Sequence, residues 1–277
     1  MLPAAAKEVN MPKSLTHAER RAAAAGSFRV FVPNAEPERV ADALARRQGA
    51  LGSLAFEVVG EMWSRPELSR RDRSLIVIST LAAQARDEEL VLHTRIGLRN
   101  GLTQSEIEEI LLHVAAYAGF PAAMASSRRV DEGLRQELGV KDLPERTAAK
   151  AKSDSDRDRD AADVLRTLTG TAEFGTGQME RMFGAAGVTA SRFAFGDIWS
   201  REELSRRDRS AIVISILIAL GAAGELAAQV QGGLRHGLTR IEIEEIVNHL
   251  SLYAGIPRAV EAMREVQSAL ARVDPNR

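Results

Sequence analysis

The chain carries the same stretch of sequence twice. Residues 60–121 align without a gap with residues 196–257, and about 36 of the 62 aligned positions are identical. Self-similarity at this level indicates a duplicated domain. The two tryptophans and the two tyrosines of the chain fall at matching positions: Trp63 with Trp199, and Tyr117 with Tyr253. We therefore expect two similar units that pack as a pseudo-dimer, in which each difference between the copies serves as an internal comparison.

Composition narrows the function classes. A chain of 277 residues is long enough for two domains, and 45% hydrophobic with 27% charged residues is typical of a globular protein. The net charge of −1 gives no basic surface for nucleic acid. Because the chain has no cysteine, disulfides, cysteine-ligated metals and thiol mechanisms are excluded.

Apolar segments do not predict a membrane span. The longest apolar run, residues 211–223, is interrupted by Ser215 and is typical of a buried helix. Lys7 and Glu8 follow a short alanine run, and no long apolar region lies near them. We expect a cytoplasmic protein with no membrane partner.

Helix signals recur along both copies, and no segment has the pattern of a strand. Ser69 is a predicted N-cap, Thr103 and Glu106 form a predicted capping box, and Gly101 suits the end of the helix before it. The second copy repeats these signals at Ser205, Gly237 and Thr239–Glu242. The prediction is an all-α fold with two tandem helical domains.

Four segments are expected. Residues 1–33 form an N-terminal extension with a short helix over 18–25, and residues 34–139 form the first repeat. Residues 140–160 are polar and charged, which favours a linker, partly disordered, and residues 161–277 form a second, partly degenerate repeat.

Polar residues with helical spacing suggest a site in the first repeat. Glu89 and His93 lie four residues apart and share a helix face, as do His113 and Tyr117. Arg73 lies on the preceding helix. Three packed helices would bring these side chains to one cleft.

At these residues the chain resembles the carboxymuconolactone decarboxylase family, which shares the alkylhydroperoxidase D-like fold. The resemblance covers about residues 50–138 and 188–272. The motifs are Trp63-Ser64-Arg65, Arg73-Ser74-Leu75, Glu89 to His93, Gly97 to Thr103, and Tyr117 to Pro121.

The chain lacks the residues that the peroxidase branch of that fold uses for catalysis, so thiol peroxidase activity is excluded. That branch uses a Cys-x-x-Cys pair before the histidine and a glutamate one helix earlier. The corresponding positions here are Arg86 and Glu89 for the thiols, and Ser74 and Ser210 for the glutamate.

The resemblance instead implies a cofactor-free decarboxylase of aromatic catabolism that acts on a small carboxylated lactone or enone. In the family reaction the substrate's own lactone carbonyl receives the electrons. The protein supplies a cation for the substrate carboxylates, a donor for the oxyanion and a proton for carbon. The expected roles are proton transfer for His93, with Glu89 orienting it, and substrate binding for five residues: Arg73, Arg95, His113, Tyr117 and Trp63.

Structural explanations compete with these roles. Glu89 and His93 could form a surface pair. His113 and Tyr117 could be structural, and the tryptophans could be core or interface anchors. The recurring charged residues near Arg71 and Asp72 fit a buried ion-pair network as well as a ligand site. The chain as a whole could be a family member repurposed for ring opening, dehydration or cyclisation, or a non-catalytic scaffold or ligand-binding protein.

Differences between the copies favour the first repeat as the catalytic half. Glu89 persists as Glu225, but His93 becomes Gln229 and Arg95 becomes Gln231. An amide cannot move a proton near neutral pH. The other second-repeat counterparts of the site are Arg209, His249, Tyr253 and Trp199.

No cluster has convincing metal-ligand spacing, so no metal is expected, and the reaction that the resemblance implies needs no cofactor. Because the single-repeat relatives assemble as hexamers, three tandem chains could form the equivalent trimer of pseudo-dimers.

Overall fold

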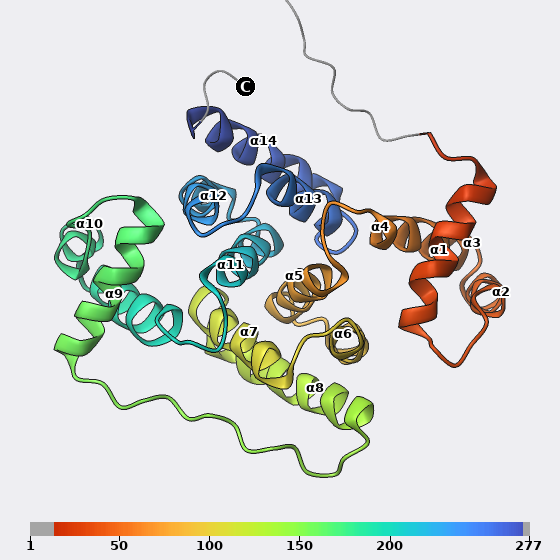
Figure 1. Ribbon diagram of the computed structural model, residues 1–277, viewed down its shortest axis with the longest axis horizontal. Helices are drawn as coiled ribbons and strands as arrows, with labels where there is room; N and C mark the ends of the chain where they lie inside the picture. Colours follow the sequence, from red (N-terminus) through yellow and green to blue (C-terminus); the bar gives the residue numbers. More distant parts are fainter. Residues whose placement is uncertain (1–13, 274–277) are drawn as a thin grey trace, which may run out of the picture. The chain divides into compact units, whose positions relative to one another are not determined.

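The structure is a computed structural model that describes residues 14–273, all of them in helices and connecting segments (Figure 1). The first 13 residues of the expected N-terminal extension lie outside this range, as do Lys7 and Glu8. The chain divides into two compact units, with the boundary between Arg65 and Pro66. Over its described residues, 14–65, the first unit contains four α-helices and a π-helical turn: α1 (His17–Phe31), α2 (Pro37–Gln48), α3 (Ala50–Leu54), η1 (Ala55–Val59) and α4 (Gly60–Ser64).

Aromatic stacking and one close backbone contact hold the first unit together. The ring of Phe28 stacks on Phe56 with centroids 4.6 Å apart, and Phe31 meets Trp63 edge-on at 4.9 Å. Gly60 allows α4 to approach α1, since a Cβ at this position would lie 2.6 Å from the Cβ of Ala24. The helix expected over residues 18–25 is therefore the middle of a longer helix, which begins at a Thr16 capping box.

The second unit contains the remaining helices. In chain order they are α5 (Arg70–Ala83), α6 (Asp87–Arg99), α7 (Gln104–Tyr117), α8 (Phe120–Leu138), α9 (Asp154–Thr169), α10 (Thr176–Thr189), η2 (Ala190–Trp199), α11 (Arg206–Leu220), η3 (Ala223–Glu225), α12 (Leu226–Arg235), α13 (Arg240–Leu250) and α14 (Ile256–Val273).

Two equivalent helices form the centre of this unit. The helices α5 and α11 pack side by side, and each is almost entirely buried from its third residue onward (Figure 1). Their N-termini are capped by Ser69 and Ser205, whose hydroxyls accept hydrogen bonds from the amides of Asp72 and Asp208, so both predicted caps are confirmed. Burial on all sides explains why both helices lack a polar face.

The repeats exchange contacts across this centre. The helix α7 of the first repeat packs against α11 of the second, and α13 of the second packs against α5 of the first. The pairs α6–α8 and α12–α14 pack in the same way within their own repeats. The all-α pseudo-dimer expected from the sequence is confirmed.

The segment expected to link the repeats is shorter than the charged run. Residues 140–153 have no regular helix, but α9 begins at Asp154, so the second half of the run is helical. Ser153 forms a capping box with Asp156, and Arg157 pairs with Asp154 one turn away. Alternating charges here stabilise a helix rather than a disordered linker.

Among the described residues, none of the helices combines the length and the apolarity that crossing a bilayer requires.

Candidate functional site

Eight of the predicted site residues, together with Glu109 and Glu245, form two clusters in the second unit, and each cluster combines residues of both repeats. The Arg209 cluster consists of Arg209, Glu109, His113, Tyr117 and Trp199. The Arg73 cluster consists of Arg73, Glu245, His249, Tyr253 and His93. The predicted grouping of Arg73 with His113 in one cleft is therefore wrong, because each arginine reaches the histidine of the other repeat.

A buried guanidinium organises the Arg209 cluster. Arg209 is fully buried, and its Nη1 donates to Oε2 of Glu109 at 2.9 Å and to Nε2 of His113 at 3.1 Å. The same carboxylate accepts from Nε of Arg201 at 2.6 Å. An arginine can only donate, so Nε2 of His113 accepts and the imidazole is neutral with its proton on Nδ1. Burial, followed by the charge of Arg209, lowers the pKa of His113 well below its usual value.

Two aromatic residues close this cluster. Nε1 of Trp199 donates to the hydroxyl oxygen of Tyr117 at 3.0 Å, and the Trp199 ring meets His113 edge-on at 5.4 Å. Burial raises the pKa of Tyr117, although the hydrogen bond from Trp199 acts against this shift. Tyr117 is therefore a neutral phenol that is already engaged with the protein.

The Arg73 cluster repeats the arrangement with one addition. Nη1 of Arg73 hydrogen-bonds Nδ1 of His249 at 2.8 Å, and Nη2 lies 2.9 Å from Oε1 of Glu245. The ring of Tyr253 stacks on His249 and also meets the ring of His93 edge-on, with centroids 5.4 Å apart.

His93 is the addition that distinguishes the two clusters. It lies on α6 with only 5% of its surface exposed, and burial lowers its pKa to about 4. The imidazole is therefore neutral at pH 7. Its counterpart Gln229 on α12 is also buried, and within the described residues Oε1 of that amide has no hydrogen-bond partner.

Other predicted residues lie away from the clusters. Glu89 and its counterpart Glu225 are exposed. Arg95 is half-buried and pairs with Glu137, its Nε 3.3 Å from the carboxylate. Trp63 is buried in the first unit.

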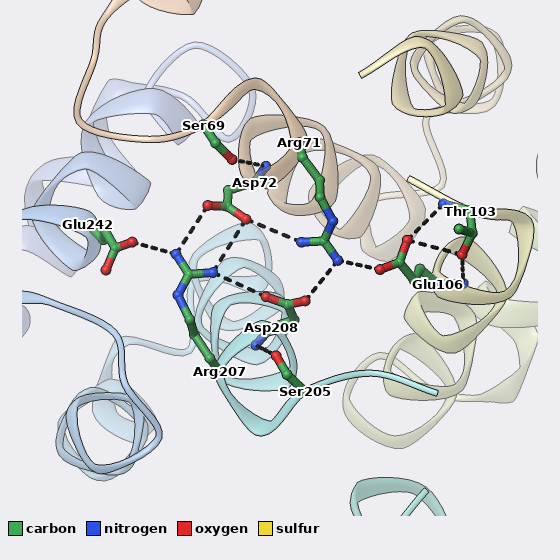
Figure 2. Close-up of polar contacts among 9 residues, drawn as sticks. All are labelled: Ser69, Arg71, Asp72, Thr103, Glu106, Ser205, Arg207, Asp208 and Glu242. Atoms are coloured by element: carbon green, nitrogen blue, oxygen red, sulfur yellow. Dashed lines mark hydrogen bonds and ion pairs between the residues drawn. The ribbon is translucent and has the colours of Figure 1, made fainter. Parts of the chain in front are cut away.

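A network of charged residues links the repeats near the N-termini of α5 and α11 (Figure 2). Arg71 pairs with Asp208 at 2.9 Å and with Glu106, while Arg207 makes the equivalent pairs with Asp72 at 3.1 Å and with Glu242. The carboxylates raise the pKa of both arginines, although burial opposes the shift. The recurring charged residues are therefore an ion-pair network between the repeats.

An open cavity of about 640 Å³ lies beside the Arg73 cluster. It is lined by the ends of α5 and α11 and by the turn between α13 and α14, and Tyr253 is one of its walls. Arg86 and Arg258 also line it, although no sequence motif assigns either of them to a ligand. In the sequence, both arginines stand out only as differences between the two copies, because Ala222 is the counterpart of Arg86 and Ala122 is the counterpart of Arg258.

Within residues 14–272, whose side chains the structure describes, no three His, Asp or Glu side chains are grouped as a metal ion would require.

Comparison with known proteins agrees with the duplication. The model of the carboxymuconolactone decarboxylase family matches residues 37–132 and 187–268, more than half of the chain. A 4-carboxymuconolactone decarboxylase of Acinetobacter baylyi is 43% identical over 81 residues, which is 29% of this chain and 60% of that protein. A nitrosuccinic acid decarboxylase of Metarhizium robertsii is 43% identical over 65 residues, 24% of this chain and 46% of that protein.

An uncharacterized 15.0 kDa protein of Paracoccus denitrificans is 32% identical over 82 residues, 29% of this chain and 61% of that protein. The alignments thus span about half to three fifths of these relatives. Two family matches, two equivalent helical repeats and the absence of cysteine lead to one assignment: the chain belongs to the carboxymuconolactone decarboxylase family as a tandem two-repeat member.

Proposed function

We propose that the chain is a cofactor-free decarboxylase of a small carboxylated lactone or enone, with His93 as its proton-transfer group. Membership of the family and two relatives named as decarboxylases support this reaction class. The observation that carries the proposal is the buried imidazole of His93, packed against a tyrosine that lines an open cavity. The equivalent residue of the other half, Gln229, cannot transfer a proton at neutral pH.

The proposed reaction needs no external electron acceptor. The bond between the carboxylate carbon and the ring carbon breaks, and its electron pair moves through the ring double bond into the lactone carbonyl. CO₂ leaves, and the carbon that collects negative charge then takes a proton. A preorganised donor at the carbonyl oxygen and a placed proton source lower the two barriers.

The lowered pKa of His93 defines when it can supply that proton. With a pKa of about 4, the free protein holds a neutral imidazole at pH 7. A substrate carboxylate brings negative charge next to the imidazole and raises its pKa, because an opposite charge nearby favours the protonated form. His93 then takes up a proton as the substrate binds and delivers it to carbon after CO₂ leaves.

The matched experiment exchanges the two residues that differ between the halves. His93→Gln should fold, because the chain already buries a glutamine at the equivalent position, Gln229. Turnover of gamma-carboxymuconolactone, followed by ultraviolet absorbance, should fall by about 10²-fold or more, the usual contribution of a proton-transfer group. The control variant Gln229→His should retain the rate. Full turnover by His93→Gln would reject the role of His93.

The same assay distinguishes two other functions, a repurposed acid–base enzyme and a non-catalytic scaffold. A folded wild-type protein that leaves this substrate unchanged but converts another carboxylated lactone or enone would indicate a repurposed acid–base enzyme. The buried histidine with its lowered pKa, and the cavity lined by its neighbour Tyr253, favour catalysis over a scaffold role.

We further propose a cytoplasmic trimer of pseudo-dimers in aromatic catabolism. Matching exposed apolar side chains, Phe120 with Ile256 and Met124 with Val260, near the starts of α8 and α14 support contacts between chains. Light scattering should give about three times the 30.1 kDa chain mass. A monomeric mass would reject the assembly.

A further inference from the structure

The cavity beside Tyr253 carries positive charge without an acidic wall. Its described lining contains two arginines, Arg86 and Arg258, and the amide of Gln84, but no aspartate or glutamate. The remaining walls are small or apolar residues and backbone of the α13–α14 turn. A cavity of about 640 Å³ has room for a small organic acid.

Neither arginine is used by the protein to neutralise a carboxylate. Arg86 is exposed, and no described acidic side chain pairs with it. Arg258 is exposed as well and donates from Nη1 to the carbonyl oxygen of Ala219, which places it at the cavity wall without an ion pair among the described residues. By contrast, Arg73 is fully buried against Glu245 and His249.

The polar side chains of the lining are not repeated at the equivalent positions of the other copy. The second-repeat counterparts of Gln84 and Arg86 are Leu220 and Ala222, and the first-repeat counterpart of Arg258 is Ala122. Leu220 lines the same cavity as Gln84, and Ala219 lines it together with its counterpart Ala83, so both repeats contribute to the walls. The positive charge comes from Arg86 and Arg258, and alanine stands at the equivalent position of each. These two differences indicate that the cavity binds an anion.

The backbone at this point is also unusual. Ala85, between Gln84 and Arg86, has φ +52°, in the left-handed region that alanine rarely adopts, and its counterpart is Gly221. A left-handed alanine costs about 1–2 kcal/mol. The same left-handed turn occurs in both repeats, because the amide of Arg86 donates to the carbonyl oxygen of Leu81 as the amide of Ala222 donates to that of Leu217. These hydrogen bonds place Arg86 at the end of α5.

We propose that Arg86 and Arg258 form a carboxylate-binding pair that selects di- or tricarboxylic acids and holds them against Tyr253. This inference rests on the proposed function, since it supplies the substrate-binding cations of that site. Guanidinium groups bind carboxylates through paired hydrogen bonds, and an acid with two or more carboxylates offers a partner to each arginine. Arg86 and Arg258 thus replace Arg73 and Arg95 as the expected substrate-binding arginines.

The test measures binding without turnover. The probe is trans-aconitate, a stable tricarboxylate, and its trimethyl ester is the uncharged control; calorimetry and amide NMR shifts give the Kd and the location. Arg86→Ala and Arg258→Ala should each weaken binding by about 10-fold or more, the usual effect of removing a hydrogen bond to a charged group. Conservative Arg→Lys variants should recover part of the affinity, because they keep the charge but lose the fork.

Controls separate this site from general charge effects. Arg128→Ala removes an exposed arginine from α8 outside the cavity lining and should leave the Kd unchanged. The ester should not bind. Unchanged affinity in the Arg86→Ala/Arg258→Ala double variant, or wild-type protein that does not bind aconitate, would overturn the proposal.

Two separate readouts distinguish failure of this inference from failure of the proposed function. His93→Gln tests turnover, whereas Arg86→Ala and Arg258→Ala test aconitate binding. If His93→Gln retains activity while the arginine variants lose affinity, the proton-transfer role fails and the carboxylate site stands. If the arginine variants bind normally while His93→Gln is inactive, only the carboxylate site fails.

Discussion

Replacing Glu109 with glutamine should destabilise the second unit severely. Glu109 is 3% exposed and is the carboxylate that faces two arginines, Arg209 at 2.9 Å and Arg201 at 2.6 Å. At an effective dielectric constant of about 20, a unit charge pair at the Arg209 distance attracts by about 6 kcal/mol. Glutamine keeps the shape and one acceptor oxygen but removes the charge.

The expected loss of unfolding free energy arises because Arg209 stays buried after its carboxylate partner is removed. Arg209 is fully buried, and its burial already lowers its pKa while Glu109 opposes that shift. A buried cation that loses its partner typically costs about 3–5 kcal/mol of unfolding free energy. The adjacent His113 cannot compensate, because its neutral ring offers only a lone pair to Arg209.

Urea unfolding followed by far-ultraviolet circular dichroism and tryptophan fluorescence measures this loss. Because the chain has two compact units, the two probes are fitted separately and compared. The control is Glu108→Gln, which removes a more exposed carboxylate that pairs with Arg146 on the surface; it should cost less than about 1 kcal/mol. Equal, small losses in both variants would refute the conclusion that the Arg209 cluster is a buried, charge-balanced core.

Two further predictions concern pH and backbone strain. The unfolding free energy should fall as the pH drops from about 6.5 towards 4, because in this range histidines bind protons in the unfolded state but stay neutral when buried in the folded state with a lowered pKa. His93 alone accounts for about 3 kcal/mol of this loss. His93→Gln should therefore reduce the pH dependence of the urea midpoint. Ala85→Gly should raise the unfolding free energy by up to about 1 kcal/mol, and Gly221→Ala should lower it by a similar amount, since both residues have positive φ. Chemical denaturation measures both changes. A lower unfolding free energy for Ala85→Gly would contradict the strain at Ala85.

Local signals in the sequence predicted the helices well. Ser69 and Thr103 cap helices where expected, because an N-cap depends only on a hydroxyl and the amides two or three residues later. The same motif at Ser153 was overlooked within a charged run, which is why α9 begins earlier than the sequence reasoning placed it. Composition favoured a linker, whereas the spacing of opposite charges favours a helix.

Contacts between the repeats could not be predicted in this way. Arg73 and His249 are 176 residues apart, and nothing local indicates that the arginine of one copy serves the histidine of the other. Glu89 shares a helix with His93 but is exposed, because a shared face does not determine which part of that face is covered. The sequence shows of Arg86 only that it stands where the peroxidase branch has a thiol, and its place in the cavity wall follows from the three-dimensional arrangement.

The pattern of divergence separates structural residues from ligand-facing ones. Each Arg–Glu–His cluster spans both repeats, so a change in either copy would leave a buried charge without its partner. Both copies retain these residues. The two arginines of the cavity lining carry no such constraint, and there the copies differ: Arg86 with Ala222, and Arg258 with Ala122.

Fusion of two repeats makes this difference possible. A homodimer of single-repeat chains has two identical ends, whereas a tandem chain can specialise one end and keep the other for stability. This difference between the ends predicts how many ligands each chain binds. Calorimetric titration with a tricarboxylate should saturate at one ligand per chain, at the end that carries His93 and Arg258. Two equivalent sites per chain would show that the second half still binds the ligand and that the loss of its arginine and histidine has no bearing on recognition.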